Sequence, residues 1–126
     1  MLHDTPHNKE KASQLLEECA AWLAILNILK EESYSLKTKL SEALDRNTGK
    51  SLVAQAETFH NLIIERDGYI KDIAADVKMQ EKKLQEAALK TPDKQRIKQQ
   101  QKLRNEIAYL EKDFAKMREG FYRKFL

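Results

Sequence analysis

The chain has 126 residues, of which 34% are charged and 41% hydrophobic, with 3 Gly, 2 Pro and a formal net charge of +3. Ala, Glu, Lys, Leu and Arg make up 65 of these residues, a proportion typical of long helices or a coiled coil. So few Gly and Pro cannot supply the turns of a many-stranded sheet, which disfavours a β-sandwich, a barrel and a Rossmann-type fold. We therefore predict a single all-α domain over 1–126.

Turn and cap residues divide the chain into three predicted helices. Thr5-Pro6 is a typical N-cap followed by a proline at the first helical position, and Thr91-Pro92 repeats it. Between them, residues 45–49 read DRNTG, a loop in which Asn47 or Gly49 is expected to take a left-handed helix cap. The expected helices are about 6–46, 50–90 and 92–119 or longer.

Apolar residues recur along each predicted helix in alternating steps of four and three, the seam spacing of a left-handed coiled coil. The seam positions are Leu15, Cys19, Trp22, Leu26, Leu29, Ser33, Leu36, Leu40 and Ala43; Leu52, Ala56, Phe59, Ile63, Arg66, Ile70, Ile73, Val77, Gln80, Leu84 and Ala87; and Leu103, Ile107, Leu110, Phe114, Met117 and Phe121. The spacing runs through Gly68, so we predict a continuous second helix; a break there, giving four shorter helices, is the alternative. Because short loops join antiparallel neighbours, the pattern predicts an elongated antiparallel three-helix, up-down-up bundle.

Two features of the seams predict specific contacts. Arg66 is a charged seam residue that lies level with Glu32 and Asp113, either of which can neutralise it. The C-terminal segment 120–126 carries three aromatic residues, which we expect to close the end of the bundle over Phe59. The alternative is that this segment docks on a partner protein.

The first helix has more apolar surface than a three-helix bundle requires. Ala21, Ala24, Ile25 and Ile28 lie on the face opposite its seam. An exposed apolar face usually marks an interface, so we predict a homodimer packed through these four residues. The alternative is that helix crossing angles bury this second face within one chain.

No combination of residues predicts catalysis, a cofactor or a metal centre, and we expect the protein not to be an enzyme. Glu57 and His60 form one ExxH unit, whereas di-iron bundles use two, and a single Glu–His pair offers too few ligands. Cys19 is the only cysteine, which excludes a disulfide framework within the chain, and its seam position favours a buried thiol.

Positive charge concentrates near the second loop. Within 82–104, eight basic residues stand against Glu86 and Asp93, a local charge of +6; they are Lys82, Lys83, Lys90, Lys94, Arg96, Lys98, Lys102 and Arg104. This basic tip predicts an anion-binding or partner-binding patch, for nucleic acid or an anionic lipid surface among others. The absence of interleaved aromatic residues disfavours nucleic acid, and a solvated tip is the alternative.

The N-terminal decapeptide lacks a basic segment followed by an apolar stretch, so we expect no secretory signal. The longest apolar run, 19–29, is shorter than the roughly 18 residues of a membrane span. We therefore predict a cytoplasmic protein without a transmembrane segment.

The three-helix pattern resembles a spectrin-type repeat in architecture only. The run Glu57-Thr58-Phe59-His60-Asn61, after the loop at Arg46-Asn47-Thr48, is similar to small uncharacterised helical, coiled-coil proteins of Bacteroidetes. That resemblance implies a bacterial cytosolic protein and assigns no activity.

From these features we predict a non-enzymatic helical interaction or scaffold protein that acts through its helix faces and basic tip. Its expected partners are a second copy of itself and an unidentified protein. The alternative is a weak nucleic-acid or anionic-surface binder that uses 82–104.

Overall fold

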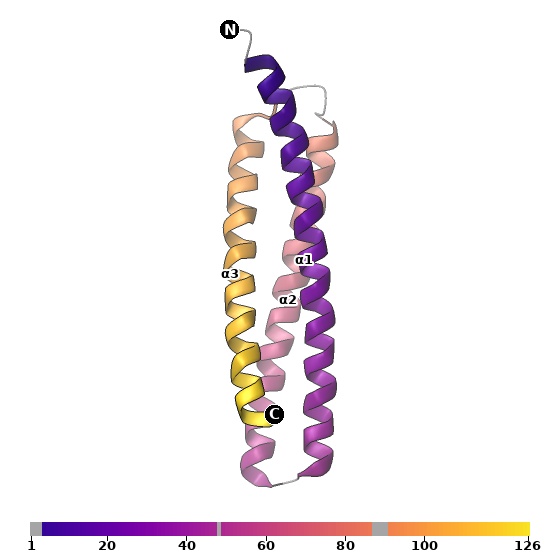
Figure 1. The fold of residues 1–126 in the computed structure, drawn as a ribbon, viewed down its shortest axis with the longest axis vertical. Helices are drawn as coiled ribbons and strands as arrows, with labels where there is room; N and C mark the ends of the chain where they lie inside the picture. The colour runs from indigo at the N-terminus through magenta and orange to yellow at the C-terminus, as the bar shows by residue number, and fades with distance from the viewer. Residues whose placement is uncertain (1–3, 48, 87–90) are drawn as a thin grey trace.

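The computed structural model describes residues 4–47, 49–86 and 91–126, and side chains from residue 12 onward. Three helices, α1 (Asp4–Arg46), α2 (Lys50–Glu86) and α3 (Lys94–Phe125), lie along one long axis, and each runs antiparallel to the helix before it (Figure 1). This confirms the predicted all-α three-helix bundle. The alternative of a break at Gly68 is wrong, because α2 is continuous through that residue.

The ends of the helices differ from the sequence predictions in small ways. The first helix begins at Asp4, so Pro6 lies within the first turn, where backbone N–H groups need no helical partner. The third helix begins at Lys94 and not at Pro92, because Asp93 is its N-cap and accepts a hydrogen bond from the Arg96 amide at 2.8 Å. The expected end of the second helix at 90 lies outside the described residues.

The connection between α1 and α2 is closed by a side chain. The Gly49 amide donates to Asn47 Oδ1 at 3.0 Å, and the Asn47 amide donates to the Ala43 carbonyl at 3.1 Å. None of the residues that the structure describes has a positive φ, so the expected left-handed cap at Asn47 or Gly49 is not formed. The asparagine side chain makes the turn instead, by binding the amide two residues ahead.

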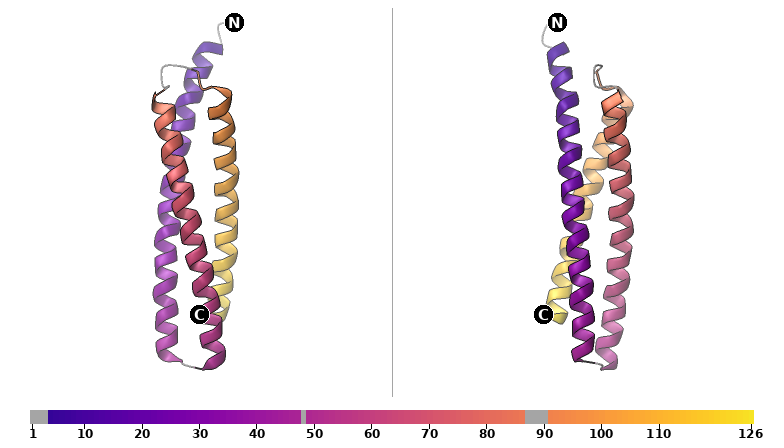
Figure 2. Two further views of the ribbon diagram at one scale, coloured as in Figure 1. Left: turned by 180° about the vertical axis from the view of Figure 1, so that it is seen from behind. Right: turned by 90° about the vertical axis from the view of Figure 1, so that its right-hand side faces the viewer.

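The predicted seams form the core. Every seam residue of α1 and α3 is buried, as are those of α2 except Leu52 and Arg66, which are half-buried; Ala87 lies outside the described residues. Figure 2 shows that α3 stops short of the α1–α2 loop, so the start of α2, where Leu52 lies, packs against α1 alone. A single neighbouring helix leaves Leu52 partly open to solvent.

Among the residues that the structure describes, one helix is long and apolar enough to cross a membrane. A window within Ala12–Arg46 of α1 reaches a mean hydropathy of 1.2. The core helix of a soluble protein passes the same test, and 33% of that window is buried within the bundle.

Candidate functional site

A buried layer of polar side chains joins the three helices near the α2–α3 connection. Gln80 and Gln100 are each 1% exposed, and Gln80 Nε2 donates to Gln100 Oε1 at 3.0 Å and to the Arg96 carbonyl at 2.9 Å. Gln100 Nε2 in turn donates to the Leu15 carbonyl at 3.1 Å and to Glu18 Oε1 at 2.9 Å. Gln100 thus connects α3 with both other helices.

The sequence prediction missed Gln100, although it lies one seam step before Leu103. Gln80 was assigned to the seam of the second helix without a partner. Since a buried amide requires hydrogen-bond partners, that unpaired glutamine was the signal that a second polar residue lay at the same level.

The rim of this layer is an ion pair between Glu18 and Arg104. Arg104 Nη2 donates to Glu18 Oε1 at 2.6 Å and its Nε donates to Oε2 at 2.8 Å, a two-pronged contact between α1 and α3. The hydrogen bond from Arg104 lowers the pKa of Glu18 below its usual value, against an opposing effect of burial, and the hydrogen bond to Glu18 raises the pKa of Arg104. Both charges are therefore used to hold α1 against α3.

Cys19 lies beside the same layer and is fully buried. Its Sγ is 3.8 Å from Gln100 Oε1, and burial raises the pKa of the thiol to about 11. A thiol that stays protonated at neutral pH and has no access to solvent does not act as a nucleophile.

Other polar contacts hold the middle of the bundle. Arg66 donates from Nε and Nη2 to the Asp113 carboxylate at 3.0 and 3.2 Å, which is one of the two pairings predicted for it. The other predicted partner, Glu32, accepts from Arg118 Nη1 at 2.6 Å. Within the described residues, no buried side-chain nitrogen or oxygen lacks a hydrogen-bond partner. These charged groups therefore serve to align the helices.

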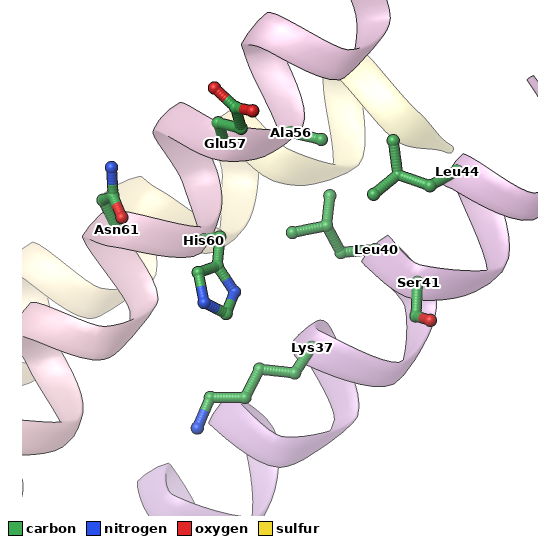
Figure 3. A pocket seen from close by; sticks show the side chains of 8 residues that line it. All are labelled: Lys37, Leu40, Ser41, Leu44, Ala56, Glu57, His60 and Asn61. Carbon is green, nitrogen blue, oxygen red and sulfur yellow. The ribbon is translucent and has the colours of Figure 1, made fainter. Parts of the chain in front are cut away.

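A shallow pocket of about 470 Å³ lies between α1 and α2 and includes the ExxH pair (Figure 3). The His60 ring is directed toward α1 and Lys37, whereas the Glu57 carboxylate is directed away from the His60 ring. Within the described residues, no three His, Cys, Asp or Glu side chains are grouped as metal ligands.

The face predicted to dimerise remains largely open to solvent. Ala21 and Ala24 are exposed, Ile28 is 54% exposed, and Ile25 is half-buried. Ile25 and Ile28 line a small groove between α1 and α3, beside Phe114. Helix crossing angles therefore do not bury this second face of α1 within one chain.

On the other side of α1, a longer groove runs between α1 and α2, with a volume of about 780 Å³. We call it the α1–α2 groove. Its apolar residues are Leu23, Leu26, Ile70, Ala74 and Ala75, and its polar residues are Asn27, Lys30, Tyr34, Lys37, Asp67, Lys71 and Lys78. This groove was not predicted from the sequence, because the lysines that line it lie outside the seam positions by which the helices were aligned.

The basic residues of the basic tip differ in whether they are paired with other side chains. Arg96 Nη1 donates to Gln80 Oε1 at 2.6 Å, Arg104 pairs with Glu18, and Lys102 lies 3.8 Å from Glu106. The remaining described lysines of the predicted patch are exposed at the end of α2 and the start of α3; they are Lys82, Lys83, Lys94 and Lys98. Lys90 lies outside the described residues.

The chain matches no protein-family model, no curated protein and no solved structure.

Proposed function

We propose that this protein is a non-enzymatic helical interaction protein that forms a homodimer through the outer face of α1. The observation that carries the proposal is the exposure of Ile28, 54%, within a face that also includes Ala21, Ala24 and Ile25. The seam residues on the opposite side of α1 already pack in the hydrophobic core of the three-helix bundle. A second apolar face on the same helix then favours a second packing partner.

The composition of this face suits the packing of one helix against another. Alanine side chains allow two helix axes to approach closely, and isoleucines beside them fill the spaces between the helices. Burying an isoleucine side chain is worth about 1.5–3 kcal/mol when it is fully exposed beforehand. In a symmetric dimer every such contact is made twice, so even a short face contributes substantially to the free energy of dimerisation.

The charges around the face predict how the dimer responds to salt. Glu17 and Glu31 are exposed, each seven residues from Ala24. An antiparallel arrangement centred on Ala24 brings Glu17 of one copy near Glu31 of the other. Because salt screens this repulsion, we expect dimerisation to strengthen as salt is added.

The test is the mass in solution, measured by light scattering over a range of concentrations. The expected mass is twice the chain mass of 14.7 kDa for the wild type, and Ile28→Glu is expected to be monomeric. Ile64→Glu is the matched control, because Ile64 is 49% exposed on α2, away from this face. A monomeric wild type, or equal effects of the two substitutions, would contradict the proposal.

A second candidate function is weak binding of nucleic acid or an anionic surface at the basic tip. The observation in its favour is that Lys82, Lys83, Lys94 and Lys98 are exposed together at one end of the bundle. Binding of a labelled duplex that falls steeply with salt and is lost in Lys94→Ala/Lys98→Ala supports it. The control is Lys112→Ala/Lys116→Ala, on exposed positions farther along α3.

A further inference from the structure

The α1–α2 groove combines an apolar floor with uncompensated positive charge. Leu26 and Ile70 are buried core residues that also line the groove, and Leu23 and Ala74 are half-buried beside them. Leu26 and Ile70 are only 2% and 5% exposed, so the apolar surface that a further helix is able to cover belongs to Leu23, Ala74 and the exposed Ala75.

Lysines line both walls of this groove. Lys30 lies on α1, and Lys71 and Lys78 lie on α2; all three are exposed, and none forms an ion pair with any residue in the described part of the chain. Lys37, the fourth lysine, is neutralised by Asp67, which also accepts a hydrogen bond from Ser33. The net charge left along the walls is positive.

We propose that the α1–α2 groove binds an amphipathic helix of a partner protein, with an apolar stripe flanked by Asp and Glu. This inference rests on the interaction role proposed above but uses a different face of α1. The apolar stripe covers Leu23, Ala74 and Ala75, and the flanking carboxylates pair with the lysines of the walls. The bound segment becomes the fourth helix of a bundle.

The dimensions of the groove set the length of its ligand. The lining residues of α1 extend from Leu23 to Lys37, a distance of about 21 Å at the helical rise of 1.5 Å per residue. A helix of about 14 residues, or four turns, covers this length.

The charge of this chain argues against a second copy as the ligand. Residues 92–126, which include α3, hold ten basic and five acidic residues, so the outward face of α3 does not complement lysine-lined walls. The outer face of α1 is already used in the proposed homodimer. A partner with an acidic helix is the ligand that the groove fits best.

The experiment measures binding of two labelled peptides of about 18 residues by fluorescence anisotropy. Both carry the same leucine stripe at helical spacing; one has Glu and the other Lys at the flanking positions. We expect the Glu peptide to bind about tenfold more tightly, and Lys30→Glu/Lys71→Glu to reverse this preference. Lys112→Glu/Lys116→Glu, two exposed positions on α3, is the matched control and should bind as the wild type does.

Two further measurements test where the peptide binds and whether a second copy of the chain occupies the groove. Amide chemical shifts should change at Leu23, Ala74 and Ala75 when the Glu peptide is added. Equal binding of both peptides, shifts elsewhere on the molecule, or equal losses in the control variant would overturn the proposal. A fall in the solution mass of the Lys30→Glu/Lys71→Glu variant would overturn it too, because the groove would then hold a second copy.

The Ile28→Glu variant separates this inference from the proposed homodimer. If both hold, that variant is monomeric and still binds the Glu peptide with wild-type affinity. If the wild type is monomeric and yet binds the Glu peptide, the homodimer fails and the groove proposal stands.

Discussion

The two ends of the bundle are held together by different chemistry. Near the α2–α3 connection, Gln80 and Gln100 form a buried hydrogen-bonded layer. Toward the other end, Phe59 and Phe121 pack edge to face, with ring centres 5.8 Å apart, and Phe125 lies 5.5 Å from Phe59. The aromatic end gains free energy from apolar burial, whereas the polar end mainly restricts which registers are acceptable.

The difference follows from the free energy that each kind of contact loses when the helices shift out of register. A phenylalanine that slips by one turn still contacts apolar neighbours, so aromatic packing tolerates small shifts. A buried amide that slips loses its partner and remains unsatisfied, which costs about 1–3 kcal/mol for each group. The polar layer therefore defines the alignment of the helices, and the aromatic end supplies more of their stability.

The largest predicted effect removes the aromatic end. Phe121→Ala is expected to lower the free energy of unfolding by about 3–5 kcal/mol, because Phe121 is fully buried against Phe59. Chemical unfolding followed by circular dichroism measures this loss. Tyr122→Ala, at the adjacent and partly exposed position, should cost much less. Equal losses at the two positions would mean that the segment does not close the bundle.

A substitution in the polar layer should behave differently depending on whether its partner is also changed. Gln100→Ala removes the acceptor of one of the two hydrogen bonds that Gln80 Nε2 donates, and it removes the side chain that donates to the Leu15 carbonyl; we expect a loss of about 1–3 kcal/mol. Gln80→Leu/Gln100→Leu removes both amides and should restore or raise stability while loosening the register. Unfolding curves measure the first effect, and double electron–electron resonance between labels on α2 and α3 measures the second.

If the double variant is as unstable as Gln100→Ala and keeps a single register, the layer contributes stability and does not define alignment. The contrast between the two ends of the bundle would then disappear.

Acid should weaken the polar end more than the aromatic end. The pKa of Glu18 is lowered in the folded protein, so its contribution to stability is present above the unfolded value of 4.5 and is lost as the pH falls through the lowered pKa. We expect the melting temperature to fall as the pH is lowered below 4.5, and to fall less in Glu18→Gln. Identical pH profiles for the wild type and this variant would contradict the assignment.

The smallest predicted effect concerns two glycines within helices. A Cβ added at Gly68 meets no atom within 4 Å, so Gly68→Ala should stabilise the protein by about 0.5–1 kcal/mol. At Gly120, a Cβ lies 3.6 Å from Phe59 Cζ, an ordinary contact that adds to the aromatic end. Thermal unfolding should show a gain for Gly120→Ala as well, and a loss there would mean that the aromatic packing is tighter than the structure shows.

The fold was predictable because helical periodicity is a local property. Alternating steps of four and three identified the buried face of each helix, and the counting of levels placed Arg66 beside Asp113. The helix ends were less predictable, since a side chain of the loop decides them: Asp93 caps α3, and Asn47 closes the α1–α2 turn.

The surfaces were harder to predict than the core because they depend on neighbouring helices. The basic residues of 82–104 appear equivalent in the sequence, yet Arg96 and Arg104 bind Gln80 and Glu18 and belong to the polar layer. Conversely, Lys30 and Lys71 lie 41 positions apart in the chain and line one groove only because α1 and α2 are antiparallel.

The odd number of helices has a mechanical consequence. Figure 1 shows the N-terminal end of α1 at one end of the bundle and the C-terminal end of α3 toward the other. Tension applied to these two ends pulls α1 and α3 lengthwise past each other, so it loads the contacts between them in shear. The Glu18–Arg104 and Glu32–Arg118 pairs, both between α1 and α3, would have to break together before the rod could extend.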